Sequence, residues 1–388
     1  TQLGRIEYAR NGGRVNTDFV DNSAGVDCSD HEVNIKILLN QAMRAGKLKQ
    51  EARNVLLAEM TNEVSDLVLR SNYLQTQALS MMEKLSGPRL GAKQHFIQVL
   101  EHEGQLDREL EGLPDDDELL DRRNRGLGLT RPELSVLLSY SKIRLYSQLL
   151  DSDIPEDPYF SKELKNYFPT PLQKDYAKYM PDHRLRRELI ATQVTNSLVN
   201  RMGVSFVMRM RDDTSATPEE VARSYAIARE LFDARAYWEK VESLDNKVDA
   251  TLQTNALLVM WTLLRQATRW IASHPGHNLD IEDMVGRLRP GIVEMRKIIS
   301  RNLNEDEKLQ VASIESPYIE GGFPKAFART IATLHLLPPA LDVVANASER
   351  DMDVKSVAMV YFGIGESLGL KWFRSHIENL SVDGQWHA

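Results

Sequence analysis

The chain has 388 residues, of which 42% are hydrophobic and 27% are charged, and its formal net charge is -8. A nucleic-acid-binding protein needs a basic surface, so this charge balance argues against that class of partner. No apolar run approaches the roughly 20 residues that span a bilayer, which argues against a membrane protein. The single cysteine cannot form an internal disulfide, which favours a reducing, cytoplasmic compartment.

The first elements differ from the rest of the chain. Residues 2–10 are predicted to be helical and to end at Asn11-Gly12-Gly13, and residues 14–20 are the one good strand candidate. Strand, small-residue turn and capped helix in succession form half of a βαβ unit. Half a unit cannot complete a parallel sheet, and the chain begins at Thr1 rather than at a methionine. We therefore expect the sheet to continue in residues that precede this chain.

From about residue 30 onward the pattern is helical. Three segments carry a capping box, in which a hydroxyl residue is followed three positions later by glutamate, so that each side chain can accept from a backbone N–H of the other. The pairs are Ser29 with Glu32, Thr130 with Glu133, and Thr217 with Glu220. A long apolar helix is predicted around residues 252–271, at the centre of a bundle. Residues 113–128, 151–158, 168–171 and 313–324 are predicted loops.

Three segments carry a resemblance to one enzyme family. Residues 16–39, NTDFVDNSAGVDCSDHEVNIKILL, closely resemble the end of the dinucleotide-binding domain of the large NAD-specific glutamate dehydrogenases of bacteria. Residues 183–203, with HRLRRELIAT and NRMG, and residues 361–372, YFGIGESLGLKW, look like segments of the C-terminal region of that family. The likeness therefore covers essentially the whole chain.

The resemblance implies a mainly α fold. Residues 1–48 would be the C-terminal remnant of the NAD-binding domain, a strand-turn-helix piece of a Rossmann-like α/β domain. Residues 49–388 would form an all-α, multi-helix C-terminal domain, with candidate internal breaks near 113–128 and 151–171. The helical domain would stabilise the catalytic core, mediate homo-oligomer contacts or transmit a regulatory signal, and the sequence does not choose among these roles.

The resemblance also implies two site residues. The smaller hexameric glutamate dehydrogenases carry a segment that aligns with residues 17–29 and matches Asn22 and Ser29. In that family the asparagine lies near the nicotinamide and the serine contacts the side-chain carboxylate of the substrate. Asn22 is thus implied as a cofactor-binding residue and Ser29 as a substrate-binding residue. A helix N-terminus at Ser29 would suit an anionic ligand, although the pattern alone favours a simple helix cap.

The resemblance therefore implies that the chain is the C-terminal fragment of an enzyme that converts L-glutamate, NAD and water into 2-oxoglutarate, ammonia and NADH. Such an enzyme needs a glycine-rich nucleotide loop, a lysine of lowered pKa and a carboxylate. We expect these groups in the upstream catalytic domains of the same polypeptide, so no catalytic residue is assigned here and the fragment is expected to be inactive. The alternatives are a free-standing helical scaffold or interaction protein, and a dehydrogenase of another amino acid.

Other motifs receive simpler interpretations. The glycines at 363, 365 and 369 lie in a helical run, so close helix packing is favoured over a dinucleotide loop. His31-Glu32 lacks the second histidine of a zinc-protease helix, and His274 with His277 lacks companion ligands, so no metal site is predicted. Cys28 is interpreted as a small turn residue. The arginines at 184, 186 and 187 are interpreted as an exposed helix face, with a contact to acidic groups of another domain or subunit as the alternative.

Overall fold

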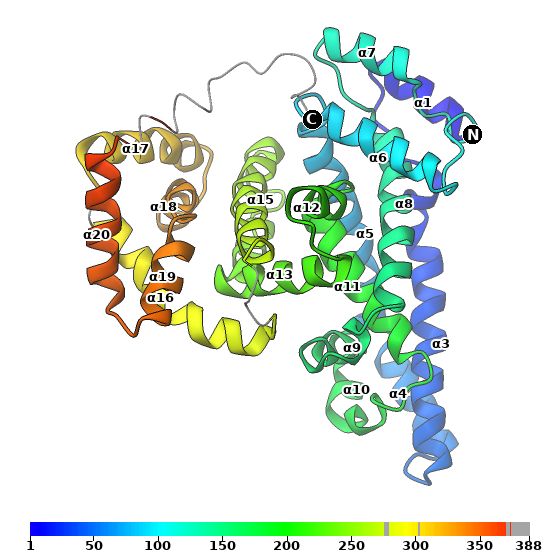
Figure 1. Ribbon diagram of the computed structural model, residues 1–388. Helices are drawn as coiled ribbons and strands as arrows, with labels where there is room; N and C mark the ends of the chain where they lie inside the picture. Colours follow the sequence, from blue (N-terminus) through cyan, green and yellow to red (C-terminus); the bar gives the residue numbers. More distant parts are fainter. Residues whose placement is uncertain (275–278, 302, 370–372, 374–388) are drawn as a thin grey trace. The chain divides into compact units, whose positions relative to one another are not determined.

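The computed structural model describes residues 1–274, 279–301, 303–369 and 373, and the glycine and histidine motifs that extend to residues 372 and 277 fall partly outside them. Figure 1 shows helices joined by loops throughout. The chain divides into two compact units, Thr1–Arg209 and Met210–Ala388. The prediction of a mainly α fold is confirmed. The predicted boundary near residue 48 stays a prediction.

The first unit contains eleven α-helices among its described residues, together with short 3-10 turns at Ile154–Glu156, Pro158–Phe160 and Ala177–Tyr179. The helices are α1 (Gln2–Arg10), α2 (Asp18–Asp21), α3 (Ser23–Arg44), α4 (Gln50–Glu59), α5 (Thr61–Lys84), α6 (Leu90–His102), α7 (Asp116–Asn124), α8 (Arg131–Leu150), α9 (Ser161–Tyr167), α10 (Thr170–Asp175) and α11 (Arg186–Met202). A twelfth helix, α12 (Phe206–Thr214), contains the division between the units.

The predicted strand at residues 14–20 is wrong. Residues 13–17 have no regular secondary structure, and α2 occupies the end of the predicted strand. The guanidinium of Arg5 explains why: it pairs with Asp18 at 2.9 Å and with Asp21 at 2.9 Å, which ties the segment to α1. No strand is present anywhere in the described residues to pair with it. The alternation of apolar residues is therefore compatible with a strand, but the segment has no second strand among the described residues to pair with.

Helix α8 forms the middle of the first unit. It packs against α11, α5 and α1, and most of its side chains are buried. Its start confirms the capping box predicted at Thr130, because the N–H of Thr130 donates to the carboxylate of Glu133 at 2.7 Å. Just before it, α7 occupies the middle of the predicted loop at residues 113–128. That prediction is wrong because Asp115 caps a helix there, accepting from the N–H of Glu118 at 2.7 Å.

The second unit is also helical. Its helices are α13 (Pro218–Leu231), α14 (Ala234–Glu242), α15 (Ala250–Ala272), α16 (Ile281–Arg301), α17 (Glu305–Glu320), α18 (Lys325–Thr333), α19 (Ala340–Glu349) and α20 (Val354–Ser367), with a 3-10 turn at Leu334–Leu336. The capping box predicted at Thr217 is confirmed, as is the long helix predicted around residues 252–271. Gly363 and Gly365 lie within α20, as the helical interpretation of that motif predicted. No helix described by the structure combines the length and apolar character needed to cross a bilayer.

Gly291 marks a close approach of two helices in the second unit. A Cβ atom placed on Gly291 of α16 would lie 2.5 Å from Cγ1 and 3.0 Å from Cγ2 of Val344 on α19. A branched valine next to the helix backbone has little room to move. We therefore expect Gly291→Ala to lower the free energy of unfolding by about 1–3 kcal/mol, measured by chemical denaturation.

The same substitution in a Val344→Ala background provides the control. There the clash is relieved, and alanine is the better helix former by about 1 kcal/mol. Gly291→Ala should then be neutral or stabilising. An equal loss in both backgrounds would show that the contact with Val344 is not the cause.

Candidate functional site

Asn22 and Ser29, the two site residues implied by the sequence, lie on one face of α3. Asn22 is the residue before the helix, and Ser29 lies about two turns further along, so their side chains leave the same side. Both are exposed. The expectation that Ser29 caps the helix is wrong, because α3 begins six residues earlier, at Ser23. At Ser29 the backbone N–H groups are already used within the helix.

Two valines complete this face, which we call the α3 face and define as Asn22, Val26, Ser29 and Val33. Val26 is 65% exposed and Val33 is 50% exposed. Their spacing along the helix places Val26 between Asn22 and Ser29 and places Val33 one turn after Ser29. The buried residues of this part of the helix are His31, Asn34 and Ile35, on its other side. A helix that presents apolar side chains at core spacing to the outside is typical of a surface that another segment or ligand covers.

The first turn of α3 is held in place from α5. The side-chain amide of Asn72 donates to the carbonyl of Val20 and to the hydroxyl of Ser23, each at 2.8 Å. Gln75 donates to the same hydroxyl at 3.3 Å. These bonds fix the position of Asn22, which lies between the two acceptors, even though its own side chain makes no capping bond.

The opposite side of α3 contacts a group of titratable side chains. His31 is 4% exposed, and its ring stacks on Tyr167 of α9 with centroids 4.3 Å apart and an interplanar angle of 10°. Nε2 of His31 lies 3.8 Å from Oδ1 of Asp27. Burial lowers the pKa of His31 below its ordinary value, although the charge of Asp27 works in the other direction. His31 is therefore predominantly neutral at pH 7.

Asn34 links the same helix to α9 and to the segment before α11. Its side-chain amide donates to the hydroxyl of Tyr167 at 3.0 Å, and its backbone oxygen lies 3.1 Å from Nε2 of His183. His183 is 3% exposed and contacts the ring of Phe168. Together these contacts fix α3 at its middle, just past the α3 face.

Asp27 and Lys142 carry the charge of this region. Burial raises the pKa of Asp27 above its ordinary value, against the lowering effects of His31, a hydrogen bond with Ser71 and the charge of Lys142. Burial also lowers the pKa of Lys142, on α8, to about 7, while the charge of Asp27 raises it. The two residues act on each other through their charges, an interaction that the sequence pattern did not predict.

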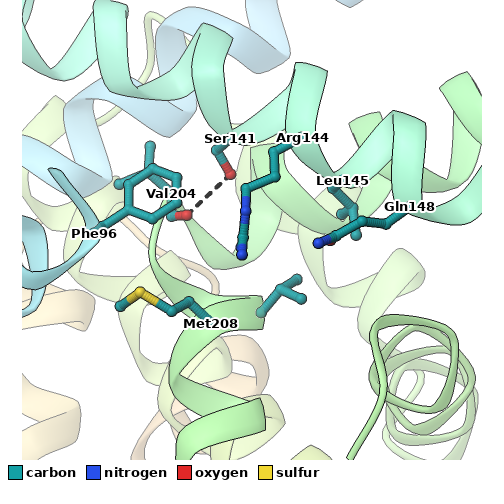
Figure 2. Close-up of a pocket in the computed structure, with 8 residues that line it drawn as sticks. Phe96, Ser141, Arg144, Leu145, Gln148, Val204 and Met208 are labelled. Carbon is teal, nitrogen blue, oxygen red and sulfur yellow. Dashed lines mark hydrogen bonds between the residues drawn. The ribbon is translucent and has the colours of Figure 1, made fainter. Parts of the chain in front are cut away.

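A small pocket within the first unit lies elsewhere, between α6, α8 and α12. Figure 2 shows Phe96, Leu145 and Met208 among its lining, and a dashed line joins the Ser141 hydroxyl to the carbonyl of Val204, at 2.9 Å. The guanidinium of Arg144 already donates to the Glu103 carboxylate at 2.7 Å and 2.6 Å. The charged group of this pocket is thus neutralised from within the protein, as in a structural ion pair.

The remaining candidate residues have structural explanations. Arg186 donates to the carbonyl of Pro155 at 2.9 Å, and Arg187 donates to the carbonyl of Leu150, the last residue of α8. These two arginines therefore act within their own unit. Cys28 is an exposed free thiol inside α3, so its interpretation as a turn residue is wrong. No group of three potential metal ligands occurs among the described residues.

Two family models match the chain, and together they cover residues 1–82 and 126–388. The family model for the C-terminal region of glutamate dehydrogenase matches residues 126–388, and the model for the catalytic domain of bacterial NAD-glutamate dehydrogenase matches residues 1–82. The chain belongs to the bacterial NAD-specific glutamate dehydrogenase family and corresponds to a C-terminal part of such a protein.

Its relatives are proteins described as NAD-specific glutamate dehydrogenases. Over 388 residues the chain is 42% identical to the protein of Halomonas elongata, 40% to that of Pseudomonas aeruginosa and 32% to that of Mycobacterium tuberculosis. In each case the whole chain is covered, but only 24% of the relative. The chain therefore spans about a quarter of the length of the curated relatives it matches.

Proposed function

We propose that this chain contributes the α3 face to the active site of an NAD-dependent glutamate dehydrogenase, whose full-length form converts L-glutamate, NAD and water into 2-oxoglutarate, ammonia and NADH. The observation that carries the proposal is the shared exposed face of Asn22 and Ser29. In this arrangement the hydroxyl of Ser29 donates to the side-chain carboxylate of glutamate, and Asn22 lies beside the nicotinamide.

Asn22 suits the nicotinamide end of NAD. A side-chain amide can donate and accept at once, which matches the carboxamide that the nicotinamide carries. Its side chain is exposed. The neighbouring Gly25 has no Cβ atom, and a Cβ atom placed there would lie only 3.1 Å from Oδ1 of Asn22. NAD supplies the hydride acceptor. We place the phosphate-binding loop and most of the NAD site in the upstream catalytic domains of the same polypeptide.

The roles of the other parts follow from the same proposal. Residues 49–388 support the catalytic core from the helical side, and the fragment alone catalyses no turnover. Homo-oligomer formation and a cytoplasmic location remain predictions, the latter supported by the single free cysteine.

A dehydrogenase of another amino acid is the second candidate. Substrate profiling of the full-length enzyme separates the two, since a preference for an apolar amino acid over glutamate would exclude the first.

The role of Ser29 is tested by Ser29→Ala in the full-length enzyme. Loss of a hydrogen bond to a charged carboxylate costs about 1.5–3 kcal/mol, so we expect the KM for glutamate to rise about 10-fold or more. The melting temperature should not change, because Ser29 is exposed and does not cap α3. Steady-state kinetics and thermal unfolding are the two measurements.

Asn40→Ala provides the matched control. Asn40 is an exposed polar residue of the same helix that lies beyond the α3 face. Its loss should leave the glutamate KM unchanged. If Ser29→Ala also leaves the KM unchanged, Ser29 does not contact the substrate and the proposed function of this face fails.

A further inference from the structure

We propose that Tyr167 and His183 are positioning residues for glutamate binding, which act through α3 and do not touch the substrate. This inference deepens the proposed function of the α3 face and rests on it. Both residues belong to the stretch 126–388 that matches the C-terminal family model, whereas α3 lies in the stretch 1–82 that matches the catalytic-domain model. The helical region thereby determines how precisely the hydroxyl of Ser29 meets the carboxylate of glutamate.

Tyr167, the last residue of α9, contacts α3 in two ways. Its ring stacks on the buried ring of His31, with centroids 4.3 Å apart and an interplanar angle of 10°. Its hydroxyl accepts from the side-chain amide of Asn34 at 3.0 Å, and Tyr167 is itself buried. A stacked ring pair and a hydrogen bond each require a particular orientation of the two partners. Together they fix α3 both along its axis and about it.

His183 adds a third directional contact, to the backbone of α3. The N–H of Leu185 donates to Nδ1 of His183 at 3.2 Å, so the proton of the neutral imidazole is on Nε2. Nε2 then donates to the carbonyl of Asn34, 3.1 Å away. Burial lowers the pKa of His183 below its ordinary value, which favours this neutral form at pH 7. Tyr167 and His183 therefore both act on one turn of α3, residues 31–34.

This turn is held on the side of α3 opposite to the α3 face. The step of two residues from Ser29 to His31 corresponds to a rotation of about 200° around the helix axis. If the buried side were not fixed, a rotation of about 15° would move a side-chain atom about 5 Å from the axis by roughly 1.3 Å. Binding groups must be held within about 0.5 Å of their productive position. The contacts of the buried side therefore decide whether the hydroxyl of Ser29 reaches its partner.

A separate attachment fixes the other end of the α3 face. Asn72 of α5 donates to the hydroxyl of Ser23, the residue that follows Asn22. The proposed cofactor end of the face is thus held from α5, whereas the end that carries Ser29 is held by Tyr167 and His183. Loss of the second attachment should therefore affect the binding of glutamate more than the binding of NAD.

The test measures the KM values for glutamate and NAD in the full-length enzyme. Tyr167→Leu removes the stacked ring and the hydroxyl, and we expect the glutamate KM to rise about 5-fold, because a displaced Ser29 loses part of a hydrogen bond to a charged group. The NAD KM and kcat should change less than about twofold. Tyr167→Phe keeps the stack, and His183→Leu removes only the bond to the carbonyl of Asn34. Each should raise the glutamate KM about 2–3-fold.

Combination with Ser29→Ala shows whether Tyr167 acts through Ser29. In the Ser29→Ala background no hydroxyl is left to position, so adding Tyr167→Leu should change the glutamate KM less than about 1.5-fold. A merely structural defect would raise the KM by the same factor in both backgrounds. The non-additivity of the two substitutions is therefore the signature of a positioning role.

Tyr237→Leu is the matched control. Tyr237 of the second unit is also buried, its hydroxyl donates to the carbonyl of Ala256 at 2.8 Å, and its ring contacts Phe327 with centroids 5.2 Å apart. The substitution removes a buried ring and a hydrogen bond, as Tyr167→Leu does, but from α14 and its contacts with α15 and α18. It should lower the melting temperature and leave both KM values unchanged.

The results distinguish the two proposals. If Ser29→Ala raises the glutamate KM while the folded Tyr167 and His183 variants leave it unchanged, the positioning role is overturned and the proposed function stands. An equal rise in Tyr237→Leu, or an undiminished effect of Tyr167→Leu in the Ser29→Ala background, also overturns the positioning role. If Ser29→Ala has no effect on KM, the proposed function fails and this inference fails with it. If Tyr167→Leu does not fold, Tyr167→Phe, which keeps the buried ring, decides the outcome.

Discussion

Replacing Glu133 with glutamine is expected to lower the free energy of unfolding by about 3–5 kcal/mol. The side chain of Glu133 is fully buried, and both of its oxygens accept from Arg122, each at 2.8 Å. Arg10 of α1 also approaches it, at 3.3 Å. Glutamine keeps the shape but removes the buried counter-charge of Arg122, which then retains only the partly exposed carboxylate of Glu118, 2.7 Å away. Urea denaturation with far-UV circular dichroism measures the change.

The pH dependence of stability gives a second measure of the same carboxylate. Burial works to raise the pKa of Glu133, but the hydrogen bonds and charge of Arg122 outweigh it and lower the pKa below its ordinary value. Stability from this group is therefore present above the ordinary carboxyl range and is lost as the pH falls through the lowered pKa. In Glu133→Gln that part of the acid-induced loss should disappear.

An exposed ion pair at the C-terminal end of α7 serves as the control. Arg125 and Asp121 are 3.2 Å apart, with side chains 65% and 62% exposed, and such pairs contribute about 1 kcal/mol or less. Asp121→Asn should therefore change stability far less than Glu133→Gln. Equal losses in the two variants would show that burial does not determine how much the Glu133–Arg122 pair contributes to the free energy of unfolding.

The second large effect is expected from Phe168→Ala, with a loss of about 3–5 kcal/mol in the free energy of unfolding. Phe168 follows α9 and is completely buried. Its ring contacts Tyr167 with centroids 5.2 Å apart and His183 at 5.6 Å, the two residues that bind Asn34 of α3. The cavity should thus destabilise the core and loosen the middle of α3. Equilibrium unfolding gives the first effect, and amide hydrogen exchange along α3 gives the second.

Phe19→Ala is a suitable comparison, because Phe19 of α2 is 44% exposed. Removing a ring that is only partly buried should cost about 1 kcal/mol or less. If Phe168→Ala cost no more than this, or if exchange in α3 stayed unchanged, the proposed support of α3 through Phe168 would be contradicted.

Local chemistry explains which parts of the fold were predictable. Thr130 and Thr217 start helices as predicted, because a capping box depends only on neighbouring backbone groups. The same pattern at Ser29 lies inside a helix, where an earlier start leaves no free N–H to cap. Asn304 and Glu307 form a third box that was missed, since only hydroxyl residues were considered and asparagine caps as well.

The two candidate site residues were also named from a local pattern. Asn22 and Ser29 belong to one short segment, so a resemblance in sequence could identify both of them as candidates. Tyr167 contacts α3, and Lys142 comes within range of the charge of Asp27, only through the folding of the chain. Neither residue has a local pattern that distinguishes it from an ordinary core tyrosine or surface lysine. The lowered pKa of Lys142 and the stacking on His31 arise from burial, which sequence spacing does not encode.

The two attachments of α3 have a consequence for binding. Asn72 holds the helix at Ser23, and Tyr167 and His183 hold it at Asn34, so the segment between them is immobilised before any ligand arrives. A molecule that binds to such a preorganised surface avoids the entropic cost of ordering it, which for each immobilised flexible side chain is about 0.5–1.5 kcal/mol. If the α3 face has the proposed function, any part of the polypeptide that moves to admit a ligand lies opposite this segment rather than within it.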